Sequence, residues 1–341
     1  MESANNIAER RIRAYFLGSG GIGVPAFDSL NDAPDIDVVG VGTRPDRPAG
    51  RRRVAHSTPI TKAADRRGIS PDKPSSINAA SFLARLQDLA LDIIVLMAFG
   101  QILKPELLNL PPYGCLNIHA SLLPRHRGAS PIQAAIVAGD TESGISFMKM
   151  NEGLDTGPVY EEHPVSLAPD ETASSLEIKL AEIAAENVCN VVRSVVWDGI
   201  QPRPQDHHRA TIAPKLKKSD GQINWREPAD LIERKIRAFT PWPRAYFFIE
   251  TGRKERRIQV VKAIADAQKP AGSKPGQILQ ADKRDWVIAC GWGCLHLKRI
   301  IPSGKKEMTA SEFLRGIQLQ VGNMVRGAPT GESPTYETTF D

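Results

Sequence analysis

Short apolar runs alternate with amphipathic stretches over about the first 200 residues of the chain. The run Ile-Ile-Val-Leu-Met at 93–97 is apolar at every position, as in a strand that a parallel sheet buries on both faces. Stretches with helical spacing separate the apolar runs, which predicts an α/β fold with a Rossmann-like, mostly parallel sheet. Strands are expected at 11–18, 36–41, 92–97, 144–150 and 158–166, and helices at 23–31, 59–67, 79–88, 131–138 and 171–198.

The pattern changes after the polar, proline-containing segment 201–205. One helix is expected at 227–239, and the other apolar positions form short runs between glycine, proline and charged residues, as in a small β-barrel of the oligonucleotide-binding (OB) type. A chain of 341 residues has the length for about two domains. We predict an α/β domain at 11–199, a linker at 200–210, an OB-like domain at 211–320 and a disordered tail at 327–341.

Charge is distributed unevenly between these parts. Residues 1–208 carry 20 Lys and Arg against 25 Asp and Glu, a net charge of −5. Residues 209–341 carry 24 against 14, a net charge of +10. The basic C-terminal third therefore predicts a surface that binds a polyanion, and the alternative is an excess of basic side chains that only keeps a small domain soluble.

A second basic region lies in the connection at 43–58, which is interrupted by prolines and has one acidic residue, Asp46. Its basic side chains are Arg44, Arg47, Arg51, Arg52 and Arg53. Long connections inside compact domains are usually functional or disordered, and this one could reach a phosphate backbone. A solvated loop that becomes ordered only on RNA is the alternative.

The first predicted strand runs into a glycine-rich turn. Gly18, Gly20 and Gly23 satisfy the G-x-G-x-x-G pattern that holds a pyrophosphate in dinucleotide-binding proteins. The second strand ends in Val-Gly-Thr-Arg at 41–44, without an acidic residue for a ribose hydroxyl. We therefore expect no nicotinamide cofactor. An oxidoreductase is the alternative function, and the glycine pattern is the only feature that supports it.

Three polar side chains follow apolar runs at predicted strand ends. Asn117 and His119 are two residues apart, so a strand through them directs both side chains to one face. Asp155 follows the run at 144–150 in a glycine-flanked loop, and its carboxylate can meet His119 if the two strands are neighbours. Together an amide, an imidazole and a carboxylate can stabilise an oxyanion and move protons. Taken singly, each residue is more often a turn or capping residue.

The loop after His119 strengthens the prediction that Asn117, His119 and Asp155 act together in catalysis. It contains Ser121, Leu122, Leu123 and Pro124. Leucines are poor loop residues unless they line an apolar slot for a ligand, and this segment is therefore the predicted wall of such a slot.

Four stretches carry a resemblance to a known family. They are Asn-x-His-x-Ser-Leu-Leu-Pro at 117–124, Asp-Thr-Gly at 155–157, Arg-Pro-Asp-Arg-Pro-Ala-Gly-Arg at 44–51 and Ile-Arg-Ala-Phe-Thr-Pro-Trp-Pro at 236–243. With them the chain resembles the formyltransferases that use 10-formyltetrahydrofolate, from about residue 11 to about residue 318. It departs from the family pattern at His126, where an aromatic residue is usual, and in its glycine-enriched first turn.

The resemblance implies an enzyme that transfers a formyl group from 10-formyltetrahydrofolate to the α-amino group of methionine on initiator tRNA, for translation initiation. It implies that Asn117 donates to the formyl oxygen, that His119 is a second donor and moves the proton, and that Asp155 orients and charges His119. Folate would lie along Ser121, Leu122, Leu123 and Pro124. The tRNA would contact Arg44, Arg47, Arg51, Arg52 and Arg53 and the basic C-terminal domain.

Three other functions remain open at this point. A sugar-nucleotide N-formyltransferase shares the Asn, His and Asp motif, and a formyltetrahydrofolate hydrolase would use the same residues with water as the acceptor. A non-catalytic RNA-binding module would explain the charge but would leave Asn117, His119 and Asp155 without a role.

The cysteines and the chain start define the remaining expectations. Cys115, Cys189, Cys290 and Cys294 have no C-x-x-C spacing, so neither a zinc site nor a disulfide framework is expected, and the last two are predicted to fill the core. Residues 1–13 are polar, and no run of about 18 apolar residues exists. We expect a cytoplasmic monomer with neither a membrane span nor a secretion signal.

Overall fold

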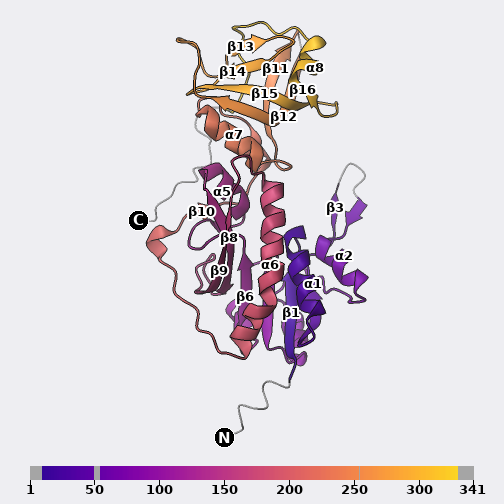
Figure 1. Ribbon diagram of the computed structural model, residues 1–341. Helices are drawn as coiled ribbons and strands as arrows, with labels where there is room; N and C mark the ends of the chain where they lie inside the picture. The colour runs from indigo at the N-terminus through magenta and orange to yellow at the C-terminus, as the bar shows by residue number, and fades with distance from the viewer. Residues whose placement is uncertain (1–9, 50–53, 253, 329–341) are drawn as a thin grey trace.

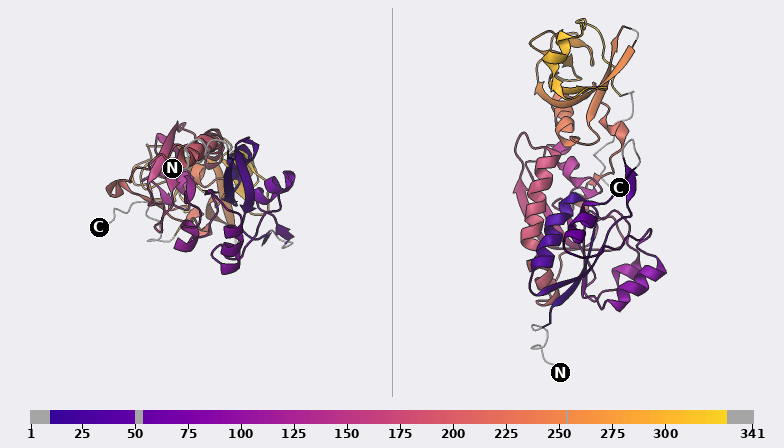
Figure 2. Two further views of the ribbon diagram at one scale, coloured as in Figure 1. Left: turned by 90° about the horizontal axis from the view of Figure 1, so that it is seen from below. Right: turned by 90° about the vertical axis from the view of Figure 1, so that its right-hand side faces the viewer.

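The computed structural model describes residues 10–49, 54–252 and 254–328. The α/β domain and the C-terminal domain are stacked along the long axis of the molecule, with helix α7 between them (Figure 1). Figure 2 shows the same stacking from the side. Among the described residues, no helix has the length and apolar character needed to cross a membrane.

The α/β domain is built on a six-stranded sheet with the order β2-β1-β5-β6-β8-β9. Its strands are β1 (Ile12–Gly18), β2 (Ile36–Gly42), β5 (Ile93–Met97), β6 (Cys115–His119), β8 (Glu142–Lys149) and β9 (Val159–Ser166). The first four pair in parallel, whereas β8 and β9 are antiparallel additions at one edge. The predicted mostly parallel α/β sheet is confirmed.

Both faces of this sheet are buried because its central strands place apolar side chains on both sides, and β5 is apolar at every position. In β1, Ala14 and Phe16 join the core on one face, and Tyr15 and Leu17 join the core on the other. The helices are α1 (Val24–Asp32), α2 (Pro59–Arg66), α3 (Ala80–Asp88), α4 (Pro105–Leu108), α5 (Pro131–Ala138) and α6 (Ala173–Val196). Apolar side chains of α1, α2, α5 and α6 fill the first core, and those of α3 and α4 fill the second.

The connection at 43–58 contains a strand pair that its sequence did not predict. β3 (Arg47–Ala49) and β4 (Val54–His56) pair in antiparallel orientation and form a hairpin beside α2 (Figure 1). The side-chain hydroxyls of Thr43 and Thr58 lie 2.7 Å apart at the base of this hairpin. The connection is therefore an ordered projection at its base, not a structureless loop.

The C-terminal domain is an antiparallel half-barrel with the strand order β11-β12-β15-β14-β13, and β16 pairs with β15. Its elements are β11 (Ala245–Thr251), β12 (Lys254–Asp266), β13 (Ile278–Ala281), β14 (Trp286–Ala289), β15 (Cys294–Pro302), β16 (Met308–Thr309), α7 (Ala229–Ala238) and α8 (Ala310–Arg315). The predicted small β domain is confirmed in this form, and α8 was not predicted.

Residues beyond the predicted domain end at 320 join the two edge strands. Val325 N donates to Gly276 O beside β13, and Arg326 N donates to Phe248 O in β11. The next residues remain attached, since Ala328 N donates to Ile223 O. The segment up to 328 thus belongs to the barrel, although a tail was predicted from 327. Residues 329–341 of that predicted tail lie outside the described residues.

The predicted linker is integrated into the α/β domain. After the helical turn His207–Arg209, β10 (Ile212–Ala213) pairs in parallel with β7 (Arg127–Gly128). β7 follows β6, the strand that carries Asn117 and His119. Leu216 then contributes to the core of the α/β domain. The chain returns across this domain before it enters the barrel.

Candidate active site

The carboxyl end of β6 carries two polar side chains on one face of the sheet. Leu116 and Ile118 enter the core on one side, so Asn117 and His119 lie on the opposite side. β8 pairs with β6 and leads into the loop that carries Asp155. Asn117 Nδ2 lies 3.5 Å from Asp155 Oδ1, and His119 Nδ1 lies 3.7 Å from Asp155 Oδ2. The structure therefore brings the three residues singled out in the sequence into one cluster.

The buried His119 ring is oriented by a backbone carbonyl. Its Nε2 lies 3.0 Å from the carbonyl oxygen of His126, which can only accept a hydrogen bond, so Nε2 carries the proton. The lone pair of Nδ1 then faces Asp155. An imidazole nitrogen in this position can take up a proton beside a carboxylate that stabilises the resulting charge.

The Asp155 loop is held by backbone contacts. Asp155 has a left-handed φ of 50°, and Gly128 N donates to its Oδ2 at 2.8 Å. Gln205 Nε2 donates to the carbonyls of Asp155 and Gly157 at 2.9 and 2.6 Å. A Cβ built at Gly157 would lie 1.8 Å from Lys149 O. Glycine at 157 and the Gln205 amide thus fix where the carboxylate points.

A buried arginine lies behind this loop. Arg127 donates to Gln205 Oε1 at 3.0 and 2.6 Å and lies 2.9 Å from His207 Nδ1. Burial lowers the pKa of the Arg127 guanidinium, and the charge of Asp155 partly opposes this shift. Gln205 and His207 were assigned to the linker, because a proline-flanked polar segment gives no signal of contacts with residues so far away in the chain.

The Ser121–Pro124 segment folds back against β8. Ser121 Oγ donates to Arg125 O at 2.6 Å, and Leu123 N donates to Ser146 Oγ at 3.0 Å. Ser146 Oγ in turn donates to Ser121 O at 2.7 Å. Ser121 is therefore a buried structural residue, which differs from its predicted position on the wall of a ligand slot.

A pocket of about 730 Å³ lies between this loop and strands β8 and β9. Among its lining residues are Leu122, Leu123, Pro124, Arg125, His126, Asp140, Glu142, Glu162 and Arg209. The predicted leucines and proline do line a cavity, but Asn117, His119 and Asp155 do not contribute to it. Strand-end geometry, and not the size of this pocket, marks the reactive centre.

His126 joins the pocket to the reactive centre. Its carbonyl accepts from His119, while its ring Nε2 lies 2.7 Å from Asp140 Oδ2. Burial raises the pKa of Asp140, but hydrogen bonds from His126 and Arg125 outweigh this and leave the pKa below its usual value. Thr211 Oγ1 accepts from His126 N at 2.8 Å. The residue that departs from the family pattern therefore holds the carbonyl that orients His119.

The predicted arginines occupy two different places. Arg44 lies at the end of β2, where its backbone N donates to Ser19 Oγ at 3.2 Å. A Cβ built at Gly100 would lie 3.3 Å from Arg44 Nη1, so this guanidinium lies over the turn that follows β5. Arg44 is thus at the strand-end edge of the sheet, on the same edge as Asn117 and His119.

The other four arginines follow Arg44 in the connection at 43–58. Arg47 opens β3, and Arg51, Arg52 and Arg53 lie outside the described residues. The acidic residue of the hairpin, Asp46, pairs with Lys73 at 2.8 Å. The negative charge of Asp46 is thereby compensated from outside the hairpin.

The glycine-rich turn packs against the turn after β5. Ser19 N and Gly20 N both donate to Ala98 O, at 3.2 and 3.3 Å, and a Cβ at Gly20 would lie 3.0 Å from Ala98 Cβ. A Cβ at Gly18 would lie 2.7 Å from the Phe16 ring. Close packing between strand ends accounts for these glycines, and two of the backbone N–H groups are already used.

Comparison with known proteins identifies the family. The family model of formyl transferase matches residues 13–192, and that of the formyl transferase C-terminal domain matches residues 215–318. The chain belongs to the formyl transferase family. The methionyl-tRNA formyltransferase of Sorangium cellulosum is 39% identical over 317 residues, which cover 93% of this chain and 100% of that protein. That of Magnetococcus marinus is 37% identical over 310 residues, covering 91% and 97%.

Solved structures share the fold of this formyl transferase at low identity. HypX from Aquifex aeolicus in complex with tetrahydrofolic acid has a TM-score of 0.56 and 16% identity over 92% of this chain, which spans only 51% of that longer protein. WlaRD, a sugar 3N-formyl transferase solved with dTDP and 5-N-formyl-THF, has a TM-score of 0.58 and 15% identity, covering 87% of this chain and 100% of that protein.

Proposed function

We propose that this formyl transferase moves a formyl group from 10-formyltetrahydrofolate to the α-amino group of methionine on initiator tRNA, for translation initiation. The observation that carries the proposal is the cluster of Asn117, His119 and Asp155 at the strand ends, within a chain whose full-length relatives are methionyl-tRNA formyltransferases. An amide, a buried imidazole and a carboxylate are suited to acyl transfer to an amine.

In the proposed reaction the amine attacks the formyl carbon, and its oxygen becomes an oxyanion. Asn117 donates its amide hydrogen to that oxygen, and His119 takes the proton that the attacking nitrogen loses. Asp155 stabilises the protonated imidazole, which then donates as the second group at the oxyanion. The C–N bond to the folate breaks as the intermediate collapses, and N10 of tetrahydrofolate receives the proton from His119.

The folate is proposed to lie along Leu122, Leu123 and Pro124, in the loop that the buried Ser121 helps to hold in place. Two observations support this assignment. The side chains at 122–124 line a cavity, and the same loop holds the His126 carbonyl that orients His119. A ligand on the other face of the loop would also satisfy the chemistry, so the test is whether Leu122→Ala raises the KM for folate while leaving the KM for tRNA unchanged.

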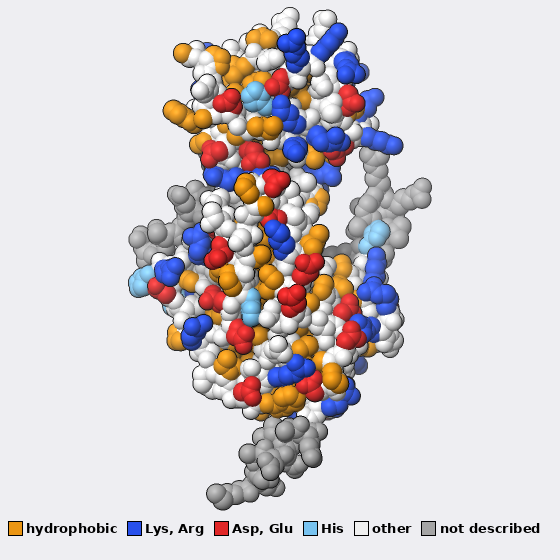
Figure 3. Space-filling view, viewed as in Figure 1, with side chains coloured by type: hydrophobic (Ala, Val, Ile, Leu, Met, Phe, Trp, Pro, Cys, Tyr) orange, Lys and Arg blue, Asp and Glu red, His pale blue; other side chains and the backbone are white. Residues whose placement is uncertain are grey.

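The tRNA is proposed to bind along the hairpin and the C-terminal domain, with the α/β domain, which includes the returning segment up to Leu216, as the catalytic unit and the barrel, which extends to residue 328, as the tRNA-binding unit. Lys and Arg side chains gather along one edge of the C-terminal domain, on the side of the molecule where the hairpin projects (Figure 3). Exposed residues of this domain include Lys254, Lys262, Lys305 and Lys306. The contacts proposed for the connection at 43–58 are those of Arg44, Arg47, Arg51, Arg52 and Arg53.

One experiment separates this function from its rivals. Purified protein is given 10-formyltetrahydrofolate with methionyl initiator tRNA, with a dTDP-amino sugar or with no acceptor. Formyl-methionine in the first reaction, and tetrahydrofolate release that depends on the charged tRNA, are the expected results. Release without any acceptor would identify a hydrolase, and a formylated sugar would identify a sugar-nucleotide enzyme.

A further inference from the structure

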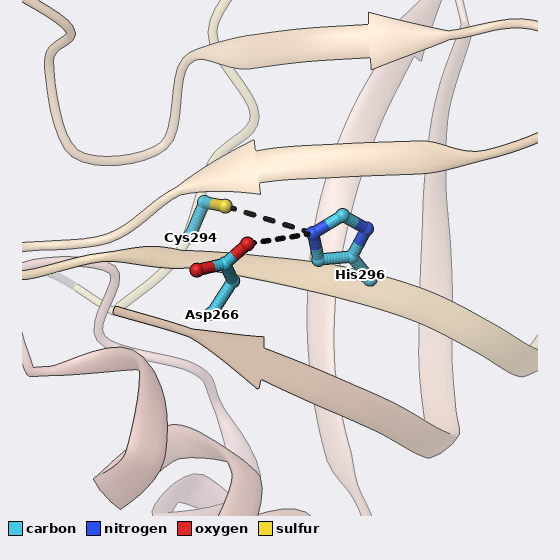
Figure 4. Close-up of side chains that lie close together, drawn as sticks. All are labelled: Asp266, Cys294 and His296. Atoms are coloured by element: carbon cyan, nitrogen blue, oxygen red, sulfur yellow. Dashed lines mark hydrogen bonds and ion pairs between the residues drawn. The ribbon is translucent and has the colours of Figure 1, made fainter. Parts of the chain in front are cut away.

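Three side chains that can bind a metal ion meet on one face of the barrel. Asp266 ends β12, and its register partner in β15 is Cys294. His296 lies two residues further along β15, so it leaves the strand on the same face as Cys294. Figure 4 shows the carboxylate, the thiol and the imidazole directed toward one another across the two strands. Only antiparallel pairing brings these ligands together, which is why cysteine spacing in the sequence gave no indication of a metal site.

The distances between the three ligand atoms are slightly longer than those in an occupied zinc site. His296 Nε2 lies 3.8 Å from Cys294 Sγ and 3.9 Å from Asp266 Oδ2, and all three atoms lie within 4.8 Å of one another. In tetrahedral zinc sites the metal–ligand lengths place such ligand atoms roughly 3.3–3.6 Å apart. Small rotations of the side chains would close that difference.

A second carboxylate orients the imidazole. Asp285 Oδ2 lies 2.5 Å from His296 Nδ1, while Asp285 Oδ1 accepts from Lys298 Nζ at 3.2 Å and from Trp286 N at 3.1 Å. The pairing with Asp285 holds the proton on Nδ1 and leaves the lone pair of Nε2 directed at Cys294 and Asp266. Carboxylate–histidine pairs of this kind support the ligands in many zinc sites.

The surroundings of the thiol favour a cation. Cys294 is buried and lies 3.2 Å from Gln268 O, while the Asp266 side chain is 49% exposed and leaves the cluster open to solvent on one side. A divalent cation would offset the carboxylates of Asp266 and Asp285 and stabilise the thiolate.

We propose that Asp266, Cys294 and His296 bind one Zn²⁺ ion, with water at the fourth position. The mixed sulfur, nitrogen and oxygen set suits zinc among the common divalent ions. The ion ties the end of β12 to the start of β15 and stabilises the barrel, and it takes no part in formyl transfer. Without a metal, the contacts of His296 with Asp266 and Asp285 would hold the same segments together, and the test must distinguish these states.

The test is a Co²⁺ titration of the full-length protein after treatment with a chelator. Wild-type protein is expected to take up about one equivalent, with a thiolate-to-cobalt charge-transfer band and the ligand-field bands of tetrahedral cobalt, and Zn²⁺ should abolish both. Cys294→Ser and His296→Gln should lose the charge-transfer band or the tetrahedral spectrum. Cys290→Ser, in the neighbouring buried cysteine, is the matched control and should bind as wild type does.

Two further readouts complete the test. Asp285→Asn acts through His296 and should weaken binding by about 10- to 100-fold without removing the cobalt–thiolate band. Zn²⁺ should raise the unfolding temperature of wild type and Cys290→Ser but not of Cys294→Ser. A wild-type protein without a charge-transfer band, or a Cys294→Ser variant with an unchanged spectrum, would overturn the proposal.

Discussion

Glycine is required at position 128 because the backbone has a positive φ there and because no space is left for a Cβ. Its N–H donates to Asp155 Oδ2, its φ is 118°, and a Cβ there would lie 2.6 Å from Ala213 O. Gly128→Ala should therefore push β7 away from β10 and release the Asp155 carboxylate. We expect at least a tenfold loss of kcat and a lower unfolding temperature.

Gly68→Ala is the control for this variant. Gly68 also has a positive φ, of 72°, but a Cβ there meets nothing within 4 Å. Backbone strain alone should cost about 1 kcal/mol of stability and leave kcat unchanged. Equal activity losses in both variants would show that the Gly128 contact does not matter for Asp155.

The proposed catalytic roles predict the effect of truncating each side chain. Asn117→Ala, His119→Ala and Asp155→Ala should each lower kcat about a hundredfold or more, because each removes a group that acts in the transition state. Circular dichroism should show an unchanged fold. A folded His119→Ala enzyme that formylates at a near wild-type rate would contradict the assignment.

Gln205 is a positioning residue with two separable functions. Its Oε1 accepts from Arg127, and its Nε2 donates to the Asp155 and Gly157 carbonyls. Gln205→Ala should reduce kcat about tenfold with little change in the KM for either substrate. Gln205→Glu keeps the acceptor for Arg127 but loses the amide donor. If Glu restores activity, the Arg127 contact dominates, and if it does not, the clamp on the Asp155 loop dominates.

The sequence predicts only part of this site, for a physical reason. Asn117 and His119 follow from the two-residue period of a strand, and Asp155 follows once β6 and β8 are neighbours. Gln205 contacts the site through pairing between segments far apart in the chain, which no local pattern encodes. His207 likewise gains its Arg127 contact only in the folded molecule.

At the scale of elements, the end of α6 is tied to the start of β2 by an ion pair with a defined pH dependence. Arg193 Nε and Nη2 lie 2.7 and 2.8 Å from the two Asp35 oxygens. The hydrogen bond from Arg193 lowers the pKa of Asp35 below its unfolded value. The pair therefore stabilises the fold above about pH 4, and the contribution is lost as the pH falls through the folded pKa.

Arg193→Met tests this contribution. The variant should lose about 0.5–1 kcal/mol of unfolding free energy at pH 7, a modest value because both side chains are partly exposed. Urea unfolding between pH 7 and pH 3 should show the difference from wild type shrinking below about pH 4. Exposed Arg66, substituted by Met, serves as the control. A difference that stays constant with pH would assign the loss to packing of the arginine stem.

Regular elements were predictable because burial imposes a period on them. The predicted strands and helices agree with the observed bounds to within two residues, as for α5 at 131–138 and α6 at 173–196. The β3–β4 hairpin and the segment at 322–326 were not predictable. Both are polar or glycine-containing and form by pairing at edges, where side-chain alternation is weak.

At the scale of the whole molecule, the arginines of the connection at 43–58 predict a salt-dependent contact with tRNA. Replacing Arg51, Arg52 and Arg53 together by Ala should raise the KM for methionyl-tRNA and leave the KM for folate unchanged. Each lost phosphate contact should reduce the slope of log affinity against log salt by roughly 0.7–0.9. Kinetics at several salt concentrations give both quantities.

One further test variant and one control complete that experiment. Arg47→Ala is measured separately, because Pro45 and Pro48 restrict the backbone around it. Arg66→Ala, at the exposed end of α2, removes a positive charge outside the hairpin. Unchanged tRNA kinetics in the triple variant and in Arg47→Ala would leave the hairpin without a role in binding, and the C-terminal charge would then carry the tRNA proposal alone.

The return of the chain across the α/β domain limits how this enzyme can be recombined with its relatives. A fragment that stops at residue 199 lacks Gln205, the β10 strand and Leu216, so its catalytic loops lose the contacts that hold them. A chimaera that takes its barrel from another protein must therefore keep the host sequence at least through residue 216, and it must also match Ala238 and Phe239 at the end of α7, which join the same core. The junction therefore lies downstream of that point, although the predicted linker begins sixteen positions earlier, near 200.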